Sequence, residues 1–197
     1  MTLAVALEAA EAGARVLRQR FGQTLQIRHK GDVDLVTDAD QQAEAAIVEV
    51  IRNHFPDHDI LAEEQDWGRC DSPCRWIIDP LDGTTNFAHG FPWFAVSIAL
   101  EITGVVEVGV VHAPAQETVF SAQRGAGAWR DGVRLQVSAT ECLDQSLLAT
   151  GFPYDRKSSP VNNYDYFLQF QQLAQACRRP GAASLDLAYT ATGAFDG

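Results

Sequence analysis

The chain has 197 residues, of which 46% are hydrophobic and 21% are charged, a composition typical of a compact globular domain. Its 26 acidic side chains outnumber the 15 Lys and Arg residues, and this balance argues against direct binding to nucleic acid or to an anionic membrane surface. Glu8 and Glu11 interrupt the start of the chain, where a signal peptide would be basic and then apolar, and no run approaches the ~18 apolar residues of a membrane span. The sequence therefore predicts a cytoplasmic protein.

Two helices are predicted in the first third of the chain. Apolar residues recur at steps of three and four from Leu3 onward, which indicates one helix that ends at Gly22. Thr37, followed three residues later by Asp40, has the form of an N-terminal cap for a second helix that stops at Pro56.

Two short apolar runs follow, at 60–62 and 76–78. Each is too short for a helix, and each leads directly into carboxylates, at Glu63-Glu64 and at Asp79. These patterns predict buried strands that carry acids at their C-terminal ends.

The remainder of the chain predicts a β-rich middle and a mixed end. Apolar segments separated by turn signals indicate an antiparallel meander with strands at 94–102, 105–111, 118–122 and 133–137. A strand at 146–150, a helix near 164–176 and a small-residue helix near 184–192 follow. The expected architecture is a single α+β domain over 1–197.

The negative charge is concentrated in one part of the sequence. The window from Asp32 to Asp82 holds 14 acidic residues against three Arg, whereas the rest of the chain is balanced. Some of these acids lie in polar, turn-like stretches, where a solvated surface explains them. The acids next to apolar runs need another explanation.

In the segment 76–87, two acids, a proline that kinks the chain and a glycine directly follow a predicted strand. Pro80 restricts Asp79 to an extended conformation, and the resulting bend can bring the Asp79 and Asp82 carboxylates to the same side. Gly83 permits close approach of the backbone to a ligand, and either threonine of the pair 84–85 is predicted to cap a helix whose free N–H groups would hold an anion.

An Asp-Gly pair alone is most often a plain surface turn. Two carboxylates about 5 Å apart, however, repel each other by roughly 3 kcal/mol at an effective dielectric of about 20, so a cluster of acids needs cations. Oxygen ligands without a thiolate pattern indicate Mg²⁺, which binds carboxylates and a substrate phosphate together.

These blocks resemble those of the inositol monophosphatase family. The resemblance is carried, in the same order, by Asp34–Asp40, Leu61–Glu64, Trp76–Phe87 and Pro180–Tyr189. It implies the layered αβαβα sandwich of the lithium-sensitive, magnesium-dependent phosphatases, and a homodimer.

The resemblance also implies a role for each matching residue. Glu63, Asp79, the backbone carbonyl of Leu81 and Asp82 would be metal ligands for two or three Mg²⁺ ions, with Li⁺ as an inhibitor. Glu63 would also serve in catalysis.

Other matching positions would contact water and substrate. Thr84, supported by Asp40, would orient the attacking water. The substrate would contact Glu63, Leu81, Asp82, Gly83, Thr84, Gly181, Ala182 and Ala183, of which the last three match the stretch near the inositol ring. Small residues there are equally typical of tight helix packing.

The function implied is Mg²⁺-dependent hydrolysis of a small phosphate monoester, with inositol monophosphate as the first choice, by direct attack of water. Relatives in the resembling family hydrolyse nucleotide bisphosphates, histidinol phosphate or fructose bisphosphate. An aspartyl-phosphate phosphatase is a mechanistic rival, although its pattern has one residue between the two Asp and this chain has two. A non-catalytic interaction protein is a further alternative, since some bacterial members are thought to assist transcription complexes.

The family pattern continues to a Trp-Asp block that supplies another metal-binding aspartate. This sequence ends at Gly197 before such a block, and Asp196 stands in a different context. We therefore expect a fragment or truncated product that lacks one ligand and part of the substrate wall, with reduced activity as an isolated chain.

Overall fold

The computed structural model describes residues 1–23, 27–29 and 35–197. Asp32 and Asp34, part of the predicted acidic region, lie outside the described residues. The two predicted N-terminal helices are confirmed as α1 (Thr2–Arg20) and α2 (Asp38–His54). Thr37 caps α2, because its hydroxyl accepts a hydrogen bond from the Ala39 N–H while the Asp40 carboxylate accepts one from the Thr37 N–H at 2.8 Å.

The main sheet has seven strands in the order β3-β4-β5-β6-β7-β8-β9. β3 pairs with β4 in parallel, and each later neighbour pairs antiparallel, so the predicted meander is confirmed. The strands are β3 (Asp59–Ala62), β4 (Cys74–Asp82), β5 (Ala95–Ile102), β6 (Val105–Ala113), β7 (Thr118–Gln123), β8 (Gly127–Arg130) and β9 (Val133–Arg134).

Several predicted boundaries are wrong. The strand expected at 133–137 is only the two-residue β9, and the strand that pairs with β7 is β8, which the sequence did not predict. The helix expected at 164–176 ends at Leu173, and residues 176–178 form the unpredicted strand β11.

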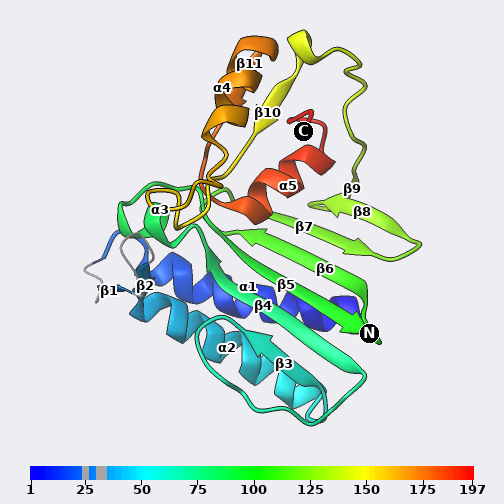
Figure 1. Cartoon of the computed structure of the whole chain (residues 1–197). Helices are drawn as coiled ribbons and strands as arrows, with labels where there is room; N and C mark the ends of the chain where they lie inside the picture. The colour runs from blue at the N-terminus through cyan, green and yellow to red at the C-terminus, as the bar shows by residue number, and fades with distance from the viewer. Residues whose placement is uncertain (24–26, 30–34) are drawn as a thin grey trace.

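The remaining elements form further layers (Figure 1). α1 and α2 cover one face of the main sheet, and α5 (Ala183–Ala191) contacts β5 and β6 from the other face. Beyond α5 lie β10 (Leu147–Ala149) and β11 (Ala176–Arg178), paired in parallel, with α4 (Tyr164–Leu173) outermost. This order of layers is the predicted αβαβα sandwich. The list is completed by β1 (Ile27–His29), β2 (Leu35–Thr37), α3 (Thr84–Ala88) and the short 3₁₀ turn Leu143–Gln145.

The principal core lies between the helix pair and the sheet. The buried face of α1 is mostly alanine, and a Cβ added at Gly13 would lie 2.7 Å from the Ile47 Cδ1 atom, so α1 and α2 approach closely. Trp76, Phe87 and Phe94 are fully buried in the same core and anchor β4, α3 and the start of β5. The elements that carry the acidic segment are therefore firmly packed.

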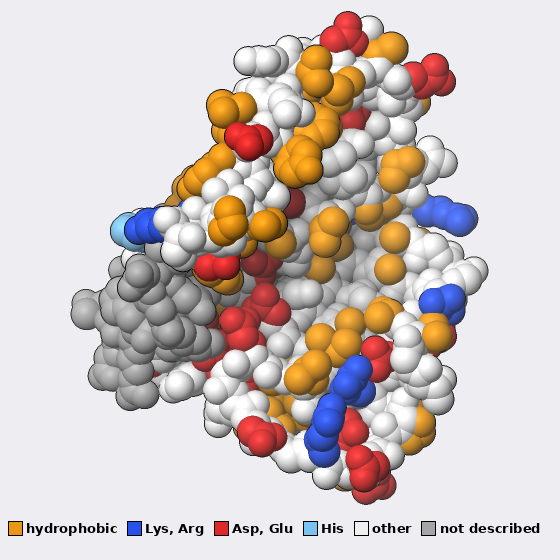
Figure 2. Space-filling view, in the orientation of Figure 1, with side chains coloured by type: hydrophobic (Ala, Val, Ile, Leu, Met, Phe, Trp, Pro, Cys, Tyr) orange, Lys and Arg blue, Asp and Glu red, His pale blue; other side chains and the backbone are white. Residues whose placement is uncertain are grey.

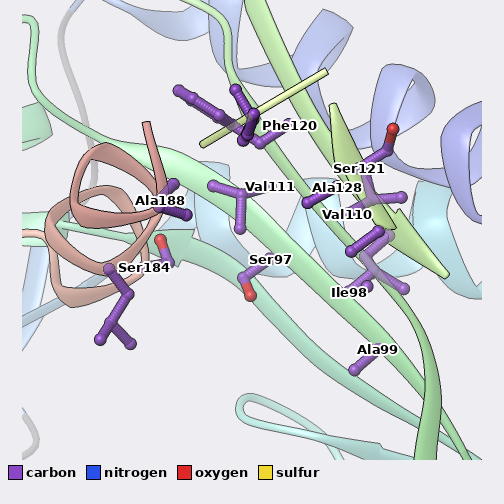
Figure 3. Close-up of a pocket in the computed structure, with 15 residues that line it drawn as sticks. Ser97, Ile98, Ala99, Val110, Val111, Phe120, Ser121, Ala128, Ser184 and Ala188 are labelled. Atoms are coloured by element: carbon purple, nitrogen blue, oxygen red, sulfur yellow. The ribbon is translucent and has the colours of Figure 1, made fainter. Parts of the chain in front are cut away.

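Figure 3 shows a cavity of about 340 Å³ between α5 and the sheet. Ser184 and Ala188 of α5 face Ser97 and Val111 of the sheet across it, and every described residue that lines it is uncharged. Its polar side chains are serines, and it lacks the charged groups that binding a metal or a phosphate needs. Among the helices in the described part of the chain, none combines the length and apolarity required to cross a membrane.

Candidate active site

Glu63, which directly follows β3, and Asp79, which lies within β4, occupy the same edge of the main sheet. In the parallel pair β3 and β4, Ala62 lies opposite Ile78, so the next residue of each strand is an acid. The two predicted strands are therefore adjacent, and each apolar run leads into a carboxylate. β3 is only partly buried, however, because Leu61 is exposed. Glu64, the neighbour of Glu63, acts on a different group, since its charge raises the pKa of Asp40.

Asp79 and Asp82 are brought together by an irregularity within β4. The strand was expected to end at Asp79, but it continues to Asp82, and its register with β5 shifts between these two residues. The Leu81 N–H donates to Asp79 Oδ1 at 3.1 Å across this bulge. The bend predicted from Pro80 is therefore present inside the strand.

The acids of this edge share one partly dry environment. Burial raises the pKa of Asp79 to about 8, and the charges of Asp82, Glu63 and Asp40 act in the same direction. Burial also raises the pKa of Asp82 and of Asp40, against the lowering effect of the hydrogen bonds that each accepts. The like charges that raise the pKa of Asp79 would be compensated by a cation bound among these carboxylates.

The space-filling view agrees with this electrostatic picture. Figure 2 shows acidic side chains gathered in a hollow of the molecular surface, with hydrophobic side chains around it. Within the described ranges, no three Asp, Glu, His or Cys side chains converge closely enough to enclose an ion by themselves. Mg²⁺ takes carbonyl, water and substrate oxygens besides carboxylates, so the residues present fit this metal.

Thr84 connects the acidic edge to α2. Its hydroxyl lies 3.2 Å from Asp40 Oδ1 and 3.0 Å from the Leu81 carbonyl oxygen, and it can donate its proton to either. Asp40 is itself held by the Thr37 N–H and hydroxyl, the latter at 2.6 Å from Oδ2. The contact between Thr84 and Asp40 that the resemblance implied is present.

Gly83 occupies a position that excludes a side chain. Its φ of +95° is left-handed, and an added Cβ would lie 2.9 Å from the Trp93 carbonyl oxygen. The prediction that Thr84 or Thr85 caps the following helix is wrong, because Gly83 itself is the N-cap of α3 and no side chain caps it. The Thr84 hydroxyl is used toward Asp40 and Leu81 instead.

The segment 180–184 closes the other side of the site. Ser184 donates to Asp82 Oδ2 from its backbone N–H at 2.6 Å and from its hydroxyl at 2.5 Å. Asn86 donates to the Trp93 and Pro180 carbonyl oxygens at 2.7 and 2.9 Å, which ties α3 to the same segment. These hydrogen bonds join two segments that lie about one hundred residues apart in the sequence.

Two cavities adjoin Asp82. The smaller, about 80 Å³, is lined by Asp82, Gly83, Thr84, Thr85, Asn86, Tyr154, Arg179 and Gly181. The larger, about 450 Å³, is lined by Asp82, 149–152, Tyr154, Arg179, 181–183, Asp186 and Leu187. Gly181, Ala182 and Ala183 therefore line a cavity beside Asp82, and their place near an inositol ring stays a prediction.

Sequence reasoning missed several residues of this site. Arg179 lines both cavities, with its guanidinium carbon 6.0 Å from the centroid of the Phe152 ring. Burial, followed by the charge of Asp82, raises the pKa of Asp186 to about 6. Ser184 was also missed, because a serine in the first turn of a helix is an ordinary feature.

A layered α+β sandwich with carboxylates on adjoining strands and a small polar cavity beside Asp82 is an arrangement suited to a phosphatase. The family model described as "Inositol monophosphatase family" matches residues 1–197, and the chain belongs to this family.

Individual relatives agree with the family assignment. The chain is 47% identical to the inositol-1-monophosphatase of Synechocystis, over 99% of this chain and 69% of that protein. It is 40% identical to the Nus factor SuhB of Escherichia coli, over 99% of this chain and 74% of that protein. The solved inositol monophosphatase of Anabaena superposes with a TM-score of 0.88 at 45% identity, covering 98% of this chain and 72% of that one.

Proposed function

We propose that the protein hydrolyses a phosphate monoester with Mg²⁺, and that inositol monophosphate is its first-choice substrate. The observation that carries this proposal is the gathering of acids around Asp79, where burial and then the charges of Asp82, Glu63 and Asp40 raise the pKa of Asp79 to about 8. Family membership supports the phosphatase class.

The metal would be held by Glu63, Asp79, Asp82 and the backbone carbonyl of Leu81, for two or three ions in all, and Li⁺ is expected to inhibit. When bound, Mg²⁺ supplies stabilisation of phosphoryl oxygens and lowers the pKa of bound water. The Leu81 carbonyl oxygen accepts from the Thr84 hydroxyl at 3.0 Å, and it would be free to bind a metal when that hydroxyl donates to Asp40 instead.

Thr84 would orient the attacking water. When its hydroxyl proton is directed to Asp40, the lone pairs of the oxygen are left to accept a hydrogen bond from water. Asp40 can play this part because the Thr37 N–H and the α2 cap hold its carboxylate in place. Glu63, at the same edge, would assist by fixing the position of that water.

The phosphate would occupy the smaller cavity beside Gly83 and Thr84, and the alcohol would occupy the larger one. Gly83 and Thr84 line the smaller cavity, where they would contact the phosphate, and Gly181, Ala182 and Ala183 leave room for a ring. Arg179 offers planar donors and Asp186 offers acceptors, a pairing suited to the hydroxyl groups of a polyol.

The test is phosphate release by the complete natural protein, with Mg²⁺ and with excess EDTA. We expect turnover of inositol 1-phosphate that stops with chelator, falls with Li⁺ and is abolished by Asp79→Asn. Activity that persists undiminished in EDTA contradicts the proposal. Parallel assays with a nucleoside 3′,5′-bisphosphate, histidinol phosphate and fructose 1,6-bisphosphate rank the family alternatives.

A second candidate, an interaction protein, is favoured by the name Nus factor given to the Escherichia coli relative. The same Asp79→Asn variant separates the two, because an interaction role survives the loss of hydrolysis whereas an enzymatic role does not. We also propose a cytoplasmic homodimer, which sedimentation of the purified protein and fractionation of cells would test.

A further inference from the structure

Glu44 is a carboxylate buried without any exposed surface, on the face of α2 that also carries Asp40 one turn earlier. Both of its oxygens accept hydrogen bonds. The Glu64 N–H donates to Oε2 at 2.7 Å, and the Trp67 indole N–H donates to Oε1 at 2.9 Å. Burying a carboxylate costs free energy, so a buried carboxylate in this position indicates a role other than filling the core.

The bond to Glu64 acts on the backbone of Glu63. The Glu64 nitrogen belongs to the planar peptide group that begins at the Glu63 carbonyl carbon, so its hydrogen bond fixes the plane that follows Glu63. On the other side, Ala62 is fixed by its register with Ile78. Glu63 is thus held from both directions at the point where its charge reaches Asp79.

We propose that Glu44 is a positioning residue of the metal centre, which holds Glu63 in the direction that binding a divalent cation requires. This inference rests on the proposed function. Two residues on one face of α2 then stabilise the site. Asp40 accepts a hydrogen bond from Thr84, and Glu44 holds the peptide group that follows Glu63. Groups that orient metal ligands typically change metal affinity by about 10–100-fold when they are altered.

The chain offers a matched control at the start of β3, with hydrogen-bond partners in the same loop as those of Glu44. Asp59, which is 7% exposed, accepts from the Cys70 N–H at 2.6 Å and from the Ser72 N–H at 3.2 Å. Like Glu44, it is a buried carboxylate that binds two N–H groups between β3 and β4. Its partners lie at the end of the loop remote from Glu63.

The experiment compares Glu44→Gln and Asp59→Asn in the complete natural protein. Each amide keeps one acceptor oxygen but turns an NH₂ group toward a donor, so each should lower the melting temperature. Binding of Mn²⁺, used as the probe for Mg²⁺, is measured by titration calorimetry, together with kcat as a function of Mg²⁺ concentration.

We expect Glu44→Gln to weaken Mn²⁺ binding by about tenfold or more and to recover most of its kcat at high Mg²⁺. Asp59→Asn should leave Mn²⁺ affinity within about twofold of the wild type. If Glu44→Gln loses thermal stability but keeps wild-type Mn²⁺ affinity, Glu44 is only structural and the inference is wrong.

A second variant keeps the test decisive if Glu44→Gln does not fold. Glu44→Asp preserves the charge but withdraws it from the Glu64 N–H, and it should weaken Mn²⁺ binding several-fold; unchanged affinity overturns the inference. A wild-type protein that neither binds Mn²⁺ nor releases phosphate is a different result, since it overturns the proposed function itself.

Discussion

The Thr84 hydroxyl lies 3.2 Å from the Asp40 carboxylate, although 44 residues separate them in the chain. This contact joins the cap of α2 to the start of α3, and it passes directly beside the acidic edge of β3 and β4. The catalytic role proposed for Thr84 depends on it.

Removing that hydroxyl should slow turnover. We expect Thr84→Ala to lower kcat by about 100-fold, in the range typical of groups that assist proton movement in the transition state. Thr84→Ser, which keeps the hydroxyl, should retain most activity. Steady-state kinetics at saturating Mg²⁺ provide the measurement, and equal losses in the two variants would show that the methyl group matters instead.

Gly83 should tolerate no side chain. Gly83→Ala adds a Cβ 2.9 Å from a backbone oxygen at a φ of +95°, whereas Gly90→Ala adds one at a φ of +70° with no atom within 4 Å. Both carry the strain of a left-handed residue, so Gly83→Ala should cost at least about 1 kcal/mol more in unfolding free energy. Urea denaturation measures the unfolding free energy of the two variants. Equal losses would mean that the backbone around Gly83 shifts without cost to accommodate the added Cβ.

The metal-free protein should lose stability as pH rises. The pKa of Asp79 is raised to about 8 from its ordinary value of 3.8, chiefly by burial and then by Asp82 and Glu63. The folded state therefore keeps a proton that the unfolded state releases, so this contribution is complete below pH about 4 and disappears as pH rises through about 8. The free energy of unfolding should fall by on the order of 1 kcal/mol per pH unit in this window.

Two controls accompany this pH prediction. Asp79→Asn should flatten the dependence in EDTA, because the group no longer titrates. Adding Mg²⁺ at pH 8 should restore stability, since a cation replaces the lost proton. Stability that rises steadily from pH 4 to pH 8 without metal would contradict the assignment of Asp79 to a crowded, buried site.

Arg179 should contribute to substrate binding. It lines both cavities beside the acids, whereas its neighbour Arg178 belongs to β11 and donates to the Cys177 carbonyl. Arg179→Ala should raise KM by about tenfold, as expected for loss of a charge-assisted hydrogen bond, and change kcat less. Arg178→Ala is the matched control, and a similar rise in its KM would indicate a general charge effect.

Much of the architecture could be predicted from local patterns. The stripe that begins at Leu3 and the cap at Thr37 specify α1 and α2, because both depend on residues close in sequence. β11 could not be found in this way. Its three residues continue directly from a helical pattern, and they become a strand through pairing with β10.

The candidate site, like the fold, was predictable only where it depends on residues close in sequence. Asp79 and Asp82 were evident from the kink at Pro80, but their position inside β4 depends on pairing with β5. Ser184 and Arg179 reach the acids only because the sandwich folds distant segments together. The prediction that a further metal-binding aspartate belongs beyond Gly197 stays a prediction.

The most direct test of the central claim is a crystal structure of the complete protein soaked with Mn²⁺, in which anomalous scattering locates each ion. We predict peaks at the acidic edge, with oxygens of Asp79, Asp82, Glu63 and the Leu81 carbonyl about 2.1 Å from an ion. Saturating Mn²⁺ that leaves no peak between Asp79 and Asp82, or that binds only elsewhere, would contradict the account.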